Sequence, residues 1–275
     1  ALHGWGEDFT LTQRYPKREQ INQYQESDLA FIERLLAEVG IFYFFTLQPD
    51  TRTEVVHFAD QQSAYEFDKR LALNSPSGMN DSGADSVWGL KILQQVAPAG
   101  VTTKDYNHRE AQKVLQSARA DITGGEGEEM RYGEVYHYKP RHLETGDAFD
   151  PAAETGNFWA RLDHERFLAE QTLITGFSTD AGLRPGQVLT ITDNSVPSTL
   201  PGVLQQPVVV IRAGFSGSMK DALRVTLAAV PYSETQCWRP ALKARPKVSG
   251  TLTARVSSPK SGEIYAHQTA EGRYR

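Results

Sequence analysis

The sequence is poor in several features that would point to a function. Its 275 residues contain one cysteine, Cys237, so no internal disulfide can form and folding needs no oxidising compartment. No run of eighteen apolar residues occurs, and we therefore expect no membrane-spanning helix. The first ten residues lack the basic and apolar parts of a secretory signal. We expect synthesis in the cytoplasm and, because the first residue is not Met, a processed chain or a fragment.

The charge balance also excludes one class of partner. The net charge is −5, with acidic and basic residues mixed along the chain. Nucleic-acid binding requires a basic face, so we expect no nucleic-acid partner. Hydrophobic residues make up 39% of the sequence, which is enough for a buried core, and the length allows two domains.

Motifs of common catalytic and phosphate-binding sites are missing. There is no G-x-S-x-G, no Walker loop and no HExxH helix. The glycines Gly124, Gly125 and Gly127 lack the lysine and the strand-to-helix context of a phosphate loop. Cys237 lies in a predicted linker without a basic neighbour to activate it. We expect neither a nucleotide site nor a cysteine nucleophile.

Two groups of titratable residues remain as candidates. His137 and His142 could bind a metal, but Pro140 lies between them and no further ligand completes a set. The carboxylates that could support glycoside hydrolysis are Glu126, Glu128, Glu129, Asp163 and Glu165. The first three lie in a Gly-rich loop, which gives no burial to raise a carboxylate pKa. The last two flank His164 on a predicted helix, where a solvated face explains them better. We expect no catalytic, cofactor or metal site.

The most regular part of the sequence is 20–45, which predicts strand, helix and strand in succession. Ser27 is suited to cap the helix, Asp28 follows at the positive end of the helix dipole, and Gly40 is suited to end it. The apolar residues with helical spacing are Leu29, Ile32, Leu35, Leu36 and Val39. We expect this stripe to face the core, and Glu33, Arg34 and Glu38 to face water. The aromatic run 41–45 predicts a strand buried on both faces.

Further elements follow from local patterns. Residues 53–59 predict a strand that forms a hairpin with 41–45, and 73–86 a surface loop or subdomain break. Asp150 and Pro151 are suited to start a helix that ends near Gln171. The other predicted strands are 9–11, 87–96, 101–106, 115–120, 132–138, 173–177, 188–192, 208–215 and 223–231. The last four should form most of a β-barrel.

These elements predict a mostly β protein with an α+β middle. The expected division is an α+β segment 1–72, a barrel-containing domain 73–236 with one helix near 151–171, a linker 237–249, and a last segment 250–275. The tight turn Gly182-Leu183-Arg184-Pro185-Gly186 should precede one barrel strand.

One long signature resembles a known family. The residues that carry it are Gln23, Tyr24, Glu26, Ser27, Asp28, Leu29, Ala30, Phe31, Leu35, Leu36, Glu38, Gly40, Ile41, Phe42 and Tyr43. This order and spacing resemble VgrG, the spike protein of bacterial type VI secretion systems, which is similar to hub proteins of contractile phage tails. The turn at 182–186 resembles the same family. The resemblance implies phage-hub-like barrels and identifies 250–275 as the start of an OB-type barrel.

The resemblance also implies a mechanical function. Three copies would form a hollow cup that sits on the tube of Hcp protein, contacts baseplate proteins and carries a puncturing tip and effectors. Such a protein would leave the cell through the type VI machinery. A threefold ring closes after three subunits.

Alternatives from other classes stay open at this stage. One is the hub of a contractile phage or prophage tail, which shares the fold. Another is a cell-wall-directed enzyme module. A third is a carbohydrate-binding module that uses Trp88, Trp159 or Trp238 as stacking platforms, although core packing explains those residues more simply.

Overall fold

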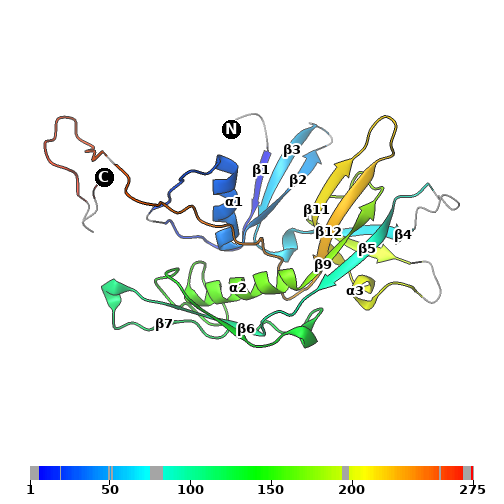
Figure 1. Ribbon diagram of the computed structural model, residues 1–275, viewed down its shortest axis with the longest axis horizontal. Coiled ribbons are helices and arrows are strands. Elements are labelled where there is room, and N and C mark those ends of the chain that lie inside the picture. The colour runs from blue at the N-terminus through cyan, green and yellow to red at the C-terminus, as the bar shows by residue number, and fades with distance from the viewer. Residues whose placement is uncertain are drawn as a thin grey trace.

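A computed structural model shows an elongated molecule with a β-barrel at one end and a long central helix (Figure 1). It describes residues 6–18, 20–48, 50, 52–74, 83–193, 198–253, 255–268 and 274. The strands are β1 (Gly6–Thr10), β2 (Phe42–Gln48), β3 (Thr53–Ala59), β4 (Glu66–Leu73), β5 (Ser86–Gln94), β6 (Gly100–Asp105), β7 (Leu115–Gln116), β8 (Glu134–Tyr138), β9 (Thr172–Ser178), β10 (Gln187–Thr192), β11 (Val208–Ser216) and β12 (Arg224–Pro231). The helices are α1 (Asp28–Val39), α2 (Gly156–Gln171) and α3 (Gly202–Gln205), with 3-10 turns at Gln62–Ala64, His108–Glu110 and Glu128–Met130.

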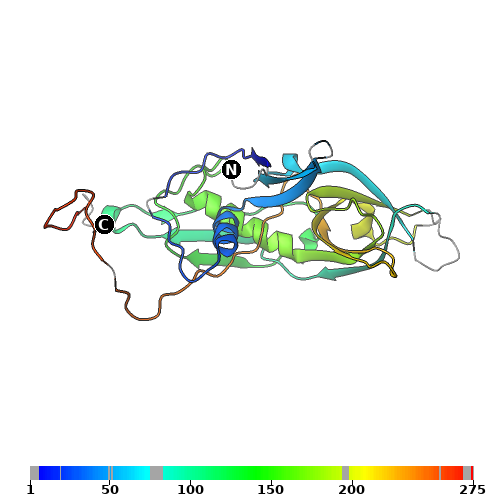
Figure 2. The same ribbon diagram turned by 90° about the horizontal axis from the view of Figure 1, so that it is seen from above.

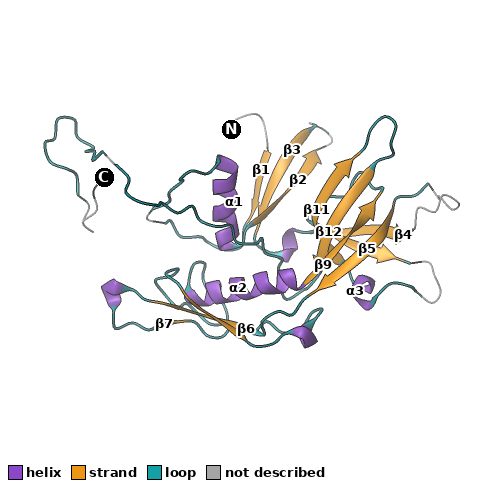
Figure 3. Cartoon of the chain, viewed as in Figure 1, coloured by secondary structure: helices purple, strands orange, loops and turns teal. Residues whose placement is uncertain are grey.

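The barrel closes in the order β10-β11-β12-β9-β5-β4. Its interior is filled by aliphatic side chains such as Val87, Ile174 and Leu189, each fully buried. Helix α3 adds Leu204 to this cluster. The four strands predicted between 173 and 231 are all present and all belong to the barrel, which confirms the predicted mostly β fold (Figure 3). Closure leaves no free strand edge in the barrel.

Two smaller sheets complete the architecture. The sheet β1-β3-β2 packs on the outside of the barrel, where Phe42 and Phe44 meet Val188, Val209 and Val230. The sheet β7-β6-β8 lies along α2 on the side away from α1 (Figure 1). Helix α2 is therefore enclosed between layers and continues directly into barrel strand β9.

Helix α1 begins and ends where its sequence predicts. The Ser27 hydroxyl accepts a hydrogen bond from the Ala30 amide at 3.3 Å. Gly40 has a left-handed backbone, with φ of 77°, and its amide donates to the Ala37 carbonyl. A Cβ at Gly40 would lie 2.3 Å from Leu162 Cδ1 of α2. Glycine is thus required both for the turn and for the close approach of α1 to α2.

Gly40→Ala should destabilise the protein by about 2–4 kcal/mol, because left-handed backbone strain and a clash in a packed core add together. The matched control is Gly133→Ala, since Gly133 has a φ of 74° and no atom within 4 Å of its added Cβ. That control should be destabilised only by the left-handed backbone strain, which costs about 1–2 kcal/mol. Urea unfolding followed by circular dichroism measures both. Equal losses would show that the Leu162 contact is unimportant.

The predicted faces of α1 are wrong. Arg34 and Glu38, expected in water, are each 6% exposed, whereas Leu29 is 62% and Ile32 48% exposed. Only the C-terminal end of the apolar stripe is covered, where Val39 packs with Trp159 and Leu162 of α2. The reason is geometric, because α1 stands with its C-terminal end on α2 and projects away from it (Figures 1 and 2).

Four further elements differ from the sequence prediction. Residues 20–26, predicted as the first strand of the run 20–45, form no strand. Strand β2 is buried on one face only, with Phe45 42% and Leu47 64% exposed, because the barrel covers just the Phe42 and Phe44 side. Helix α2 starts at Gly156 instead of residue 151, because the Gly156 amide donates to the Glu144 carbonyl before the helix begins. Strand β7 ends at Gln116, and only an isolated bridge extends it at Ala120.

The chain after β12 forms no strand in its described residues up to 268, where Gln268 bridges to Tyr274. The strands that the start of an OB-type barrel at 250–275 would contribute are therefore not formed in the described residues of that segment. Residues 254 and 269–273 of that prediction lie outside the described residues, as do 75–82 of the predicted loop and Pro49 and Thr51 of the hairpin turn. Strand β4 was not predicted and lies ahead of the expected boundary at residue 73.

Candidate assembly site: buried ion pairs around the central helix

Four consecutive polar residues of α2 are buried. Asp163, His164, Glu165 and Arg166 are between 0% and 7% exposed. Consecutive helical positions point about 100° apart, so the helix is covered on every side. The expectation that Asp163 and Glu165 face solvent is wrong, because α1, the β6 sheet and the C-terminal segment enclose α2. Buried charges require partners, and these partners come from distant parts of the chain.

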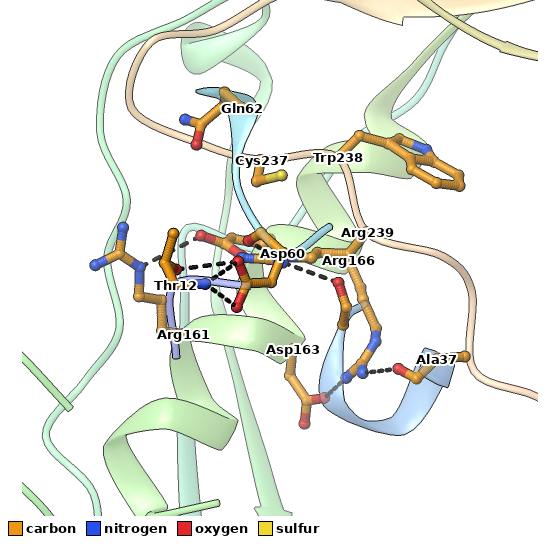
Figure 4. Close-up of polar contacts among 12 residues, drawn as sticks. Thr12, Ala37, Asp60, Gln62, Arg161, Asp163, Arg166, Cys237, Trp238 and Arg239 are labelled. Carbon is orange, nitrogen blue, oxygen red and sulfur yellow. Dashed lines mark hydrogen bonds and ion pairs between the residues drawn. The ribbon is translucent and has the colours of Figure 1, made fainter. Parts of the chain in front are cut away.

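Glu165 is paired with Arg239 of the C-terminal segment. Arg239 Nε donates to Glu165 Oε2 at 2.5 Å, and its Nη1 donates to the Gly40 and Asp60 carbonyls at 2.9 and 2.8 Å. Figure 4 shows this guanidinium where the ends of α1 and β3 meet α2. Burial alone would lower the pKa of Arg239, but the Glu165 carboxylate outweighs it and raises the pKa. One side chain therefore joins four segments.

Asp60 holds the N-terminal segment at the same place. Its carboxylate accepts hydrogen bonds from the Thr12 and Gln13 amides, the Thr12 hydroxyl and the Tyr15 hydroxyl, at 2.9 to 3.1 Å. Burial and the Asp60 charge raise the pKa of Tyr15, which keeps that hydroxyl a donor. Asp60 is 2% exposed, whereas Thr12 lies at the surface, so these partly buried bonds tie the N-terminal segment to the core.

Asp163 joins α2 to the segment after β8 and to α1. It accepts from His137 Nδ1 at 2.8 Å, Arg141 at 2.5 Å and Arg166 at 2.7 Å. Arg166 also donates to the Ala37 and Glu38 carbonyls at 2.5 and 2.8 Å. Burial acts to raise the pKa of Asp163, but the His137 hydrogen bond and the two arginines lower it overall. The carboxylate is thus ionised at neutral pH.

Glu38 is the centre of a third cluster, on α1. It accepts from Arg18 at 2.8 Å, Arg245 at 2.7 Å and Arg34 at 3.4 Å. Burial acts to raise the pKa of Glu38, and the hydrogen bonds from Arg245 and Arg18 more than reverse that effect. Proton donors at neutral pH need the opposite, a raised pKa. Both Glu38 and Asp163 are therefore suited to fix segments in place and poorly suited to donate protons.

The candidate histidines do not come together. His137 contacts Asp163, whereas His142 is 4% exposed and packs against the Gly156 backbone. Within the described residues, no three His, Cys, Asp or Glu side chains gather in a way that could hold a metal ion.

The Gly-rich loop binds a cation with its carbonyls. The Arg131 guanidinium donates to the Ile122, Gly124 and Glu126 carbonyls at 2.9 to 3.3 Å. A phosphate loop presents amides instead, so this geometry is its reverse. Glu128 and Glu129 are exposed, without the burial that a catalytic acid needs.

The three tryptophans considered above as stacking platforms lie in different environments. Trp88 stacks on Phe177, Trp159 is 6% exposed beneath Arg141, and Trp238 meets the edge of Phe42. They form no common row.

Cys237 is part of the core and not of a linker. It is 3% exposed in the cluster that contains Phe42 and Tyr65. The Tyr65 hydroxyl lies 3.4 Å from Sγ, and burial raises the pKa of the thiol to about 11. The nucleophilic thiolate is thus suppressed at neutral pH.

Comparison with known proteins identifies the family. Residues 1–205 match the phage tail baseplate hub (GPD) family. The chain belongs to this baseplate hub family. The type VI secretion system spike protein VgrG5 of Pseudomonas aeruginosa is 26% identical over 271 residues, covering 92% of this chain and 32% of VgrG5. The actin cross-linking toxin VgrG1 of Vibrio cholerae is 25% identical over 272 residues, covering 94% and 23%.

A solved structure extends this likeness to three dimensions. The E. coli c3393 protein superposes with a TM-score of 0.62 at 30% identity, covering 98% of this chain and 54% of that protein. It is a component of the type VI secretion system and exhibits structural similarity to the T4 bacteriophage tail proteins gp27 and gp5. The predicted resemblance to VgrG is confirmed. This hub chain spans about a third of the length of VgrG5.

Sequence reasoning missed the residues that join the segments of this hub protein. Arg239 and Asp60 stand in unremarkable loops, and no local spacing relates either of them to Glu165. The one available signal was α2 itself, whose charged residues are distributed around the helix without a polar face. A helix of that kind either bridges solvent or needs charge partners.

The buried titratable groups predict that acid destabilises the hub protein. Burial lowers the pKa of both His142 and His164, so below about pH 6.5 the unfolded chain takes up protons first. The free energy of unfolding should fall from pH 7 to 5, lowering Tm by several degrees. The lowered pKa values of Asp163 and Glu38 add a second fall near pH 4 and below. Thermal unfolding across pH measures this, and a Tm that rises from pH 7 to 5 would contradict it.

Proposed function

We propose that this chain forms part of the trimeric hub of a type VI spike protein, with a mechanical and not a catalytic function. The match to c3393 over 98% of the chain carries the proposal. The family is a baseplate hub family, and the relative VgrG5 is a type VI spike protein. Three copies would form a cup seated on the Hcp tube, contact the baseplate and carry a tip or effector. Export through the type VI machinery is part of the same proposal. Among the described residues, no helix is long and apolar enough to cross a membrane.

The exposed face of α1 supports self-association. Leu29 and Ile32 on α1 and Phe45 and Leu47 on β2 are each more than 40% exposed. The Tyr43 hydroxyl, on the same face of β2 as Phe45, donates to Glu33 of α1 at 2.7 Å. This hydrogen bond brings the two exposed sets together as one face. Large exposed apolar patches mark interaction sites, and we assign this face, called the α1–β2 face, to the contact between subunits.

The division of the chain remains part of the proposal. We keep an α+β segment 1–72, a barrel domain 73–236, a linker 237–249 and the start of an OB-type barrel at 250–275. Two observations support small changes to these domain boundaries. Strand β4 adds residues from Glu66 onward to the barrel, and Cys237 to Arg239 pack in the core, so the linker would begin at Pro240.

The alternative is a hub of a contractile phage tail. The family description favours it, because it names a phage tail baseplate hub. The two alternatives share the fold and the expected threefold assembly, and they differ in the tube protein that the hub would contact.

Light scattering at several concentrations tests the assembly. One chain has a mass of 30.6 kDa, so a trimer would measure about 92 kDa. A trimer would support the hub proposal and show that this region associates by itself. If the chain is a monomer, a longer version with added N- and C-terminal segments should form a trimer. A longer chain that stays monomeric would refute the proposal.

A further inference from the structure

A large cleft lies between the N-terminal segment, α1 and the C-terminal segment. It is bounded by residues 14–18 and 20–24, by Arg34, Leu35 and Glu38 of α1, by residues 139–144 and 152–155, and by the C-terminal segment 242–248. Its volume is about 1280 Å³, which exceeds the roughly 300–1,000 Å³ of small-molecule pockets. The size therefore suits a segment of a polypeptide better than a metabolite.

The lining of this cleft is basic in an acidic protein. The cations are Arg14, Lys17, Arg18, Arg34, Lys139, Arg141, Lys243 and Arg245, and the carboxylates are Glu38, Glu144 and Glu154. The lining has eight cations and three carboxylates, and Glu26, Glu33 and Asp163 pair with three of these cations from outside the lining. The eight cations exceed the six carboxylates by two, whereas the whole chain carries −5. Such an excess inside a concave surface attracts anionic partners.

Three of these cations are available to a ligand. Arg14, Lys17 and Lys139 are exposed and form no ion pair with any residue that the structure describes. The other five are held by carboxylates of this chain, as Arg245 is by Glu38. The unpaired cations come from two separate segments, 14–17 and the loop at 139. A ligand that contacts all three would therefore bridge these two segments.

Apolar side chains line the same cleft. Ile21 is 50%, Leu143 62%, Leu242 45% and Val248 46% exposed, and each lines the cleft. Trp159 contributes from the enclosed side. A purely anionic polymer would leave this apolar surface unused. The combination fits a chain in which carboxylates alternate with large apolar side chains.

We propose that this cleft binds an extended acidic segment of a partner protein, with its carboxylates on Arg14, Lys17 and Lys139 and its apolar side chains between them. The proposal goes beyond trimer formation, because none of the exposed apolar residues of the α1–β2 face lines the cleft. Nucleic acid fits less well, since Glu38, Glu144 and the apolar lining would face phosphates. The C-terminal segment 242–248 forms one wall, so a bound partner would also contact the start of whatever follows it in a longer chain.

Fluorescence anisotropy of the 275-residue chain tests this, with a fluorescein-labelled peptide that repeats Glu-Leu-Glu-Glu-Phe-Asp. We expect saturable binding that weakens at least about tenfold when NaCl rises from about 50 to about 300 mM, because screening reduces exposed charge interactions. The test variant combines Arg14→Glu, Lys17→Glu and Lys139→Glu. It should lower the affinity at least about tenfold, and its unchanged Tm would show that the fold persists.

The matched control combines Arg70→Glu, Lys91→Glu and Lys220→Glu, three exposed residues of the barrel domain. It changes the net charge equally and should bind like the wild type. Three results would overturn the proposal. The cleft variant could bind the peptide as tightly as the control, or the wild-type chain could show no binding up to about 1 mM peptide. Single-stranded DNA could bind more tightly than the peptide. Loss of a trimer in the cleft variant, with peptide binding unchanged, would assign the cleft to the subunit contact instead.

Discussion

Replacing Arg239 by methionine should destabilise the protein by about 3–5 kcal/mol, because the buried Glu165 carboxylate loses its buried cation and keeps only the longer contact to the half-exposed Arg161. Glu165 is 3% exposed, and the Gly40 and Asp60 carbonyls would lose their donor at the same time. We expect Tm to fall by about 10 °C or more. Urea and thermal unfolding followed by circular dichroism measure the loss. The rate of amide hydrogen exchange at the Gly40 turn should also rise, because α1 and the C-terminal segment lose contacts there.

Arg161→Met is a matched control on the same carboxylate. Arg161 Nε donates to Glu165 at 3.3 Å, but its side chain is 50% exposed. Exposed ion pairs contribute about 0–1 kcal/mol, so this variant should be nearly as stable as the wild type. The double variant Glu165→Leu, Arg239→Met should lose less folding stability than Arg239→Met alone, because no buried unpaired charge remains. Equal losses in the Arg239 and Arg161 variants would contradict burial as the cause.

In the proposed trimer, Ile32→Arg should abolish association of the subunits while leaving each subunit folded. Ile32 is 48% exposed on α1, so arginine at this position is solvated in the monomer but would place an unpaired charge in the subunit contact. We expect the mass measured by light scattering to fall from about 92 kDa to the 30.6 kDa of one chain. The dissociation constant should rise at least about a hundredfold, which corresponds to about 3 kcal/mol.

Val96→Arg is the corresponding control. Val96 is 61% exposed but lies after β5, away from the α1–β2 face. The same change of charge and size there should leave the trimer intact. A trimer that survives Ile32→Arg would place the subunit contact elsewhere, whereas a Tm lowered by Ile32→Arg would show that Ile32 stabilises the monomer.

The strands of the barrel could be predicted because their pattern is local. Residues 173–177, 188–192, 208–215 and 223–231 are β-branched and apolar, and the strands observed there differ by no more than a residue or two at each end. The cap at Ser27 and the turn at Gly40 are likewise local, since each depends on the backbone of its own helix end. Strand β4 escaped prediction because residues 66–70 are largely polar, and its place is decided by pairing with β10 and β5.

Burial could not be predicted in the same way. Periodicity says that one face of α1 is apolar, but it does not say which part of that face this chain covers. Only the last turn meets α2, so Leu29 and Ile32 remain exposed. The charged run on α2 has no apolar stripe, and its burial follows from sheets and segments that come from far along the chain.

The sequence by itself therefore determined the elements, the mostly β fold and the hub family, because caps, turns, strand composition and a long signature are properties of neighbouring residues. The tertiary structure alone decided which charges are buried, which cations stay unpaired and which apolar face is left open. Glu165 and Arg239 are 74 residues apart and Glu38 and Arg245 are 207 apart. Such pairs arise only when packing brings distant segments together, and a buried charge then selects the partner that satisfies it.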